Sequence, residues 1–109
     1  MFNIKPKPTF EAIVEIPVPG SEPQPLCLVF KHKNRKEVAE FFDDAGKAEV
    51  VDAKVLSGIV VDWKDVEADG AKVNFSLEAL QDILDNYHSA VIAIFKTYGE
   101  QLAEGRRKN

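Results

Sequence analysis

The sequence has few of the residues from which catalytic and metal sites are usually built. Its 109 residues include one cysteine and two histidines. Cys27 alone excludes an intrachain disulfide and a cysteine-rich metal site. His32 and His88 form no HExxH or HxH pattern, and the sequence contains no Walker loop, GxSxG or GxGxxG motif. No nucleophile, base and orienting group can be assembled from these residues. We therefore predict a protein that is not an enzyme and that needs no cofactor or metal.

Long apolar segments are also absent. The sequence has no run of 18 apolar residues, so we expect no membrane helix. Residues 1–8 lack the apolar region of a signal peptide, which predicts a protein that stays in the cytoplasm. An apolar content of 45% is nevertheless normal for a globular chain. The length predicts a single domain over residues 1–109.

The net charge of −4 is unevenly distributed along the chain. Residues 37–104 carry fifteen acidic residues and five lysines, whereas residues 1–36 and residues 105–109 each have a net charge of +3. The acidic middle argues against broad contact with a nucleic acid backbone. It is either a well-solvated helical surface or a surface that steers a basic partner.

The first third of the chain has the pattern of two β-strands. Apolar and polar side chains alternate over residues 9–18, and residues 26–33 also divide into two faces. The segment between them is rich in proline and is predicted to be a loop. This pattern predicts an antiparallel β-hairpin over residues 1–33. Its stiff tip is either an ordinary connector or an edge that binds a partner.

Residues 34–104 are predicted to form about four helices. Asn34 and Glu37 have the pattern of a capping box at the start of the first helix, and Gly46 fits its C-terminal cap. A second helix is predicted over residues 48–61, because apolar residues recur there at helical spacing. Residues 62–74 are then expected to be a polar connector.

Two serines are predicted to cap the last two helices. Ser76 precedes the third helix and Ser89 the fourth, which Gly105 ends. The fourth helix is apolar around most of its circumference, so we expect it to be central and Phe95 to be fully buried. The predicted fold is therefore α+β, with an N-terminal antiparallel hairpin packed on about four α-helices. A basic tail, residues 105–109, follows.

Aromatic residues are the candidates for contact with a partner. Trp63 lies in the polar connector, where it is either a core residue or an exposed interface anchor. Phe41, Phe42, Tyr87 and Tyr98 lie on predicted helices, where they line either the core or a binding groove.

The order of several segments resembles the tail assembly chaperone family of long-tailed bacteriophages. The most specific of them are Val60-Val61-Asp62-Trp63, the Asn86-Tyr87 pair and the ending Arg107-Lys108-Asn109. The likeness covers nearly the whole chain. It departs from the family pattern at Asp62, where glycine is expected before the tryptophan, and at His88, where proline is expected after Asn-Tyr. Both positions are at expected turns.

The resemblance implies a function in virus assembly. It implies a chaperone that binds the tape measure protein and keeps that long helical chain soluble in the host cytoplasm, and that is absent from the mature virion. It also implies a longer product, made by ribosomal frameshifting, that recruits the tail tube protein. A chaperone of this kind is expected to associate with itself when its client is absent.

Two other functions remain open at the level of the sequence. One is a structural tail component, such as a terminator or completion protein. The other is a small DNA-binding regulator that uses the basic base of the hairpin and the basic tail. The acidic and apolar character of the predicted helices argues against the regulator, because a recognition helix is normally basic.

Overall fold

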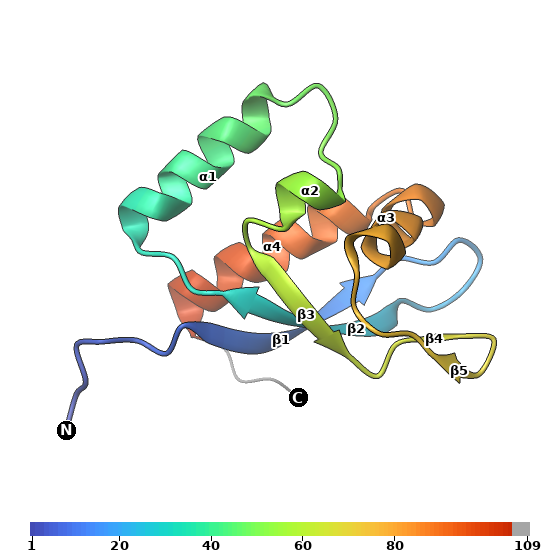
Figure 1. Ribbon diagram of the computed structural model, residues 1–109, viewed down its shortest axis with the longest axis horizontal. Helices are drawn as coiled ribbons and strands as arrows, with labels where there is room; N and C mark the ends of the chain where they lie inside the picture. The colour runs from blue at the N-terminus through green and yellow to red at the C-terminus, as the bar shows by residue number, and fades with distance from the viewer. Residues whose placement is uncertain (106–109) are drawn as a thin grey trace.

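A computed structural model describes residues 1–105 of the chain, so the predicted basic tail lies outside the described residues after Gly105. The helices lie on one side of a three-stranded sheet, and the first residues extend away from it (Figure 1). This arrangement confirms the α+β prediction. The elements in chain order are β1 (Thr9–Ile16), β2 (Gln24–Lys31), α1 (Arg35–Lys47), α2 (Ala53–Leu56), β3 (Val60–Lys64), β4 (Glu67–Ala68), β5 (Ala71–Lys72), α3 (Leu77–Asn86) and α4 (Ala90–Glu104).

The predicted hairpin is confirmed by the pairing of β1 with β2. The two strands are antiparallel, and their register sets Phe10 opposite Phe30 and Ala12 opposite Leu28. The side chains of these pairs face the helices, and Ala12, Leu28 and Phe30 are fully buried. The alternation seen in the sequence thus corresponds to one covered and one open face of the sheet.

The second predicted helix is wrong over most of its length. Only α2, four residues capped by Asp52, is helical in this segment. The chain then enters β3, which pairs antiparallel with β2 and completes a sheet of order β1-β2-β3. The run Ile59-Val60-Val61 is β-branched throughout, which favours a strand, and Gly58 precedes it. The predicted polar connector is therefore partly strand, and it also contains the short β4–β5 ribbon.

The helix caps agree with the sequence at two of the three predicted N-caps. The capping box of Asn34 and Glu37 is present at the start of α1, and Ser76 caps α3 through a 3.0 Å bond from the Ala79 N–H. Ser89 makes no side-chain cap to α4, contrary to the prediction. Gly46 is also not a cap, because α1 continues to Lys47 and ends at Ala48.

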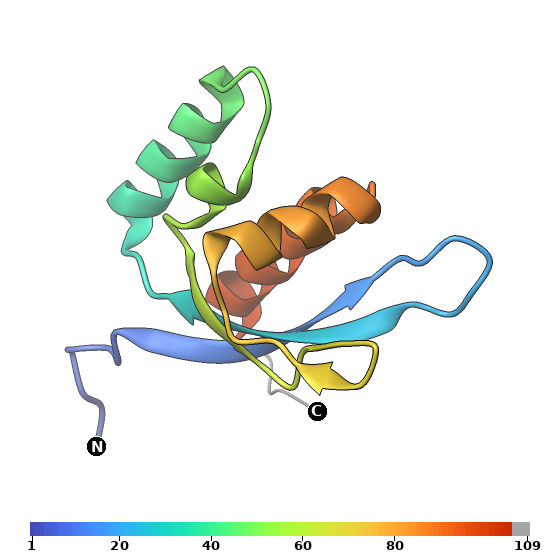
Figure 2. The same cartoon turned by 45° about the vertical axis from the view of Figure 1, so that its right-hand side comes forward.

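The core lies between the sheet and the helices. Helix α4 packs against β1, where the ring of Tyr98 meets the rings of Phe10 and Phe30 at centroid distances of 5.9 and 5.2 Å. Only one side of α4 is buried, since Ile92 is 72% exposed. Phe95 is half-buried, which corrects the prediction of a fully buried ring. The cause is the orientation of Phe95 toward α1, which stands farther from the sheet than α4 does (Figure 2).

Candidate partner-binding site

Helix α1 is held to the rest of the protein through aromatic rings. The rings of Phe41 and Phe42 each meet the ring of Phe95 edge-on, at centroid distances of 5.9 and 5.1 Å. All three side chains are half-buried. The one fully buried residue of α1 is Ala45. The contact between α1 and α4 thus depends on long side chains rather than on close approach of the helix backbones.

A glycine after α2 makes room for the first of these rings. A Cβ atom at Gly58 would lie 2.9 Å from Cε1 of Phe41, closer than real side chains come. Gly58 therefore allows the Phe41 ring to lie against the backbone just before β3. This contact holds the middle of α1 against the segment between α2 and β3.

An apolar groove of about 720 Å³ lies between the first turns of α1 and the last turns of α4. We call it the α1–α4 groove. Val38 and Ala39 line it from α1, and Gly99, Leu102 and Ala103 from α4. The remaining lining residues belong to the segment that joins β2 to α1: His32, Lys33, Asn34 and Arg35.

The α4 side of the groove is open at its glycine. A Cβ atom at Gly99 would meet no other atom within 4 Å. Glycine in the interior of a helix is about 1 kcal/mol less favourable than alanine. Packing within the described chain gives no reason for this glycine, whereas a partner that approaches the α4 backbone closely would give one.

Two of the predicted partner-binding residues lie in the core, one of the two places that the sequence allowed for them. Tyr98 is fully buried, and its hydroxyl donates a 2.8 Å hydrogen bond to the Lys31 carbonyl. Burial, with a smaller contribution from the negative charge of Glu37, raises the pKa of Tyr98 to about 12. Trp63 is 6% exposed, and its indole N–H donates to the Val73 carbonyl at 3.0 Å.

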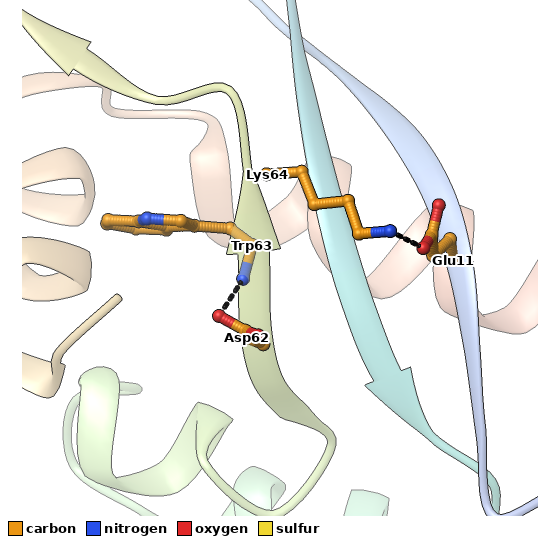
Figure 3. Close-up of polar contacts among 4 residues, drawn as sticks. All are labelled: Glu11, Asp62, Trp63 and Lys64. Atoms are coloured by element: carbon orange, nitrogen blue, oxygen red, sulfur yellow. Dashed lines mark hydrogen bonds and ion pairs between the residues drawn. The ribbon is translucent and has the colours of Figure 1, made fainter. Parts of the chain in front are cut away.

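The residues on either side of Trp63 in β3 make polar contacts. Figure 3 shows its ring on the helix side of the sheet, whereas Lys64 extends across β2 to an ion pair with Glu11 on β1. The carboxylate of Asp62 accepts a 2.8 Å hydrogen bond from the Trp63 N–H. Asp62 is the position where the family resemblance leads one to expect glycine, and its side chain here has a local structural role.

The other predicted residues lie in two separate places. Phe41 and Phe42 follow the groove residue Val38 by about one turn of α1 but do not line the α1–α4 groove themselves, and their contact with a partner stays a prediction. Tyr87 is half-buried and lines a second pocket of about 420 Å³, with Ile16 and Leu26 of the hairpin. The structure therefore does not bring the five predicted residues together in one site.

The groove residues were not identified from the sequence. Val38 and Leu102 follow the apolar stripes of their helices, a pattern that favours a place in the core. Gly99 carried the available signal, because it is a glycine inside a helix with Ala103 one turn later on the same face. That signal indicates that another backbone or a partner approaches this face of α4 closely, but it does not identify which.

The described residues offer little for chemistry. Residues 1–105 contain no group of three or more His, Cys, Asp or Glu side chains placed to hold a metal ion. Cys27 is a half-buried free thiol in β2. None of the helices in this part of the chain is long and apolar enough to cross a membrane.

An apolar groove between two helices, beside a cluster of half-buried rings, is typical of a small protein-binding domain. The chain belongs to the phage tail assembly chaperones, because the model of that family matches residues 1–109. This match confirms the family resemblance found in the sequence. No curated protein and no solved structure matches the chain significantly.

Proposed function

We propose that this chaperone binds the tape measure protein of the phage tail and keeps it soluble until the tail tube forms around it. It acts in the cytoplasm of the bacterial host and does not remain in the mature virion. A longer product of the same gene would recruit the tail tube protein through its extension.

The α1–α4 groove is the observation that carries this proposal. Its walls come from two helices, and its lining atoms are mostly apolar. An amphipathic helix binds such a groove by burying its apolar face, with anchor residues at i, i+3, i+4 and i+7. A long helical client kept in solution needs its apolar stripe covered in this way, and no reactive group is required for that.

Exposed apolar side chains elsewhere support a protein that associates with others. Val50 and Ile92 are each 72% exposed, and Leu77 and Val61 are exposed to a smaller extent. Scattered residues of this kind are common on monomers. Together with the apolar α1–α4 groove, they favour self-association of the chaperone in the absence of its client.

Co-expression with the tape measure protein of the same genome tests the proposal. We expect a soluble complex with the wild-type chaperone, and insoluble tape measure protein without it. The variant Gly99→Leu fills the groove and improves helix propensity by about 0.5–1 kcal/mol. Circular dichroism should therefore show that the variant is folded. In its presence the tape measure protein should nevertheless remain in the insoluble pellet.

Gly46→Leu is the matched control. Gly46 is also a glycine inside a helix with open space beside it, but it does not line the groove. This variant should solubilise the client as the wild type does. Equal solubilisation by Gly99→Leu would show that the groove is not the binding site. Absence of any complex, with the chain found in purified virions, would make it a structural tail component instead.

A further inference from the structure

The charged side chains among the described residues that line the α1–α4 groove are all basic. Lys33 and Arg35 flank Asn34, the residue that caps α1, and both line the groove. Among the described residues that line it, none is acidic. This is unusual for a chain with eighteen acidic and fourteen basic residues, in which the segment 37–104 is strongly acidic.

The walls of the groove permit close approach of a helix. Ala39, Gly99 and Ala103 present small side chains or none, whereas Val38 and Leu102 supply apolar contacts. Helix axes pack 8–10 Å apart, and the smaller distances require small residues at the contact. An extended peptide would instead seek a sheet edge, where its backbone hydrogen bonds can be satisfied.

We propose that the α1–α4 groove selects an acidic amphipathic helix, whose apolar face lies on Val38 and Leu102 and whose Asp or Glu side chains pair with Lys33 and Arg35. This inference rests on the proposed function and adds the chemistry of the client segment to it. Charge complementarity of this kind sets orientation and partner choice more than it sets affinity. The segment of the client that binds here is then distinguished from its other amphipathic segments by negative charge near one end.

The test uses two fluorescent helical peptides with the same apolar face. One carries Glu and the other Lys at the positions that flank that face. Each is titrated against the full chain at low salt, and binding is measured by fluorescence anisotropy. We expect the Glu peptide to bind about tenfold more tightly than the Lys peptide, and the difference to shrink as salt screens the exposed charges.

Charge reversal on the protein identifies the groups responsible. In the double variant Lys33→Glu/Arg35→Glu, the preference should reverse in favour of the Lys peptide. The control Lys54→Glu/Lys72→Glu makes the same change in charge at exposed lysines outside the groove, and it should keep the preference of the wild type. Gly99→Leu should weaken both peptides equally.

Three results would overturn the inference: no binding of either peptide to the wild type, equal binding of both, or a preference that survives reversal of Lys33 and Arg35. These results are separate from failure of the proposed function. If the reversed variant still solubilises the tape measure protein while Gly99→Leu does not, the groove is the client site but its charge does not select the client. If the peptides behave as expected and the tape measure protein is not bound, the groove takes acidic helices but the proposed client is wrong.

Discussion

Two clusters of aromatic rings pack against α4, with a looser contact between Phe42 and Tyr98, and they differ in what lies behind them. Phe30 and Tyr98, between the sheet and α4, are fully buried. Phe42 and Phe95, between α1 and α4, are half-buried although their rings are just as close, with centroids 5.1 Å apart. Ring distance alone therefore does not identify a core. The first cluster is covered by a sheet, whereas the second lies beside an open groove, so we expect the second to be weaker and more adjustable.

The largest difference should appear when one ring of each cluster is removed. Phe30→Ala leaves a cavity in the core and should lower the free energy of unfolding by about 3–5 kcal/mol. Phe95→Ala should cost only about 1–2 kcal/mol, because its side chain already contacts solvent. Urea denaturation of both variants measures the two costs. Equal costs would show that the two clusters have the same role in stability.

Alkaline pH should weaken the sheet–α4 cluster through Tyr98. The folded protein raises the pKa of Tyr98 from 10.0 to about 12, because burial disfavours the phenolate. The stabilisation of the neutral phenol is complete below pH 10 and is lost as the pH rises through 12. We expect an extra loss of roughly 2 kcal/mol in unfolding free energy across that range.

Tyr98→Phe is the control for this pH dependence. At neutral pH it should cost about 1 kcal/mol, because it removes the hydrogen bond to the Lys31 carbonyl. Above pH 10 its stability should fall less than that of the wild type, since lysine titration is common to both proteins. Parallel curves for the two proteins would rule out Tyr98 as the cause.

The cluster between α1 and α4 should adjust when a methyl group is added at Gly58. Gly58→Ala forces the Phe41 ring to move, and the ring can do so because α1 is held by side chains. We expect a cost of about 0.5–1 kcal/mol, partly offset by the lower entropy of the unfolded chain. Amide chemical shifts should change along α1 and stay constant in β1 and β2. Changes spread over the sheet would mean that α1 is rigidly coupled to the core.

The smallest effect should come from the open face of the sheet. Glu11→Gln removes the ion pair with Lys64, in which both side chains are partly exposed. Pairs of this kind contribute about 0.5 kcal/mol or less, and salt reduces that further. Thermal denaturation at low and high salt measures this effect. A loss of more than about 1 kcal/mol in unfolding free energy would show that the ion pair stabilises the fold more than an exposed pair should.

The parts of the fold that sequence reasoning found are those fixed by neighbouring residues. The cap formed by Asn34 and Glu37 closes within one turn, and the alternation around Val14 is visible in a window of eight residues. The strand β3 was missed because its partner β2 is about thirty residues away. Its own five residues follow apolar positions at helical spacing, which a local pattern cannot distinguish from a continued helix.

The α1–α4 groove could not be predicted from local sequence patterns for the same reason. Ala39 and Gly99 are sixty residues apart in sequence, and their meeting depends on how far α1 stands from α4. The sequence placed Phe41, Phe42 and Tyr98 on the correct apolar faces of their helices. It could not show that Tyr98 is covered by the sheet while the two phenylalanines are only half-buried between α1 and α4, because that depends on tertiary packing.

The hydrogen bond from the Trp63 N–H to Asp62 has a consequence for colloidal behaviour. β3 is one of the two end strands of the sheet, β1 being the other, and an end strand is where another chain can add and start fibrous growth. At this edge the donor of Trp63 is already taken by a side chain, and the strand is only five residues long with a charged residue at its end. Strand-by-strand growth therefore has a poor starting point here. At the β3 edge, a protein proposed to work beside an insoluble chain is thus protected from being drawn into the deposits of its client.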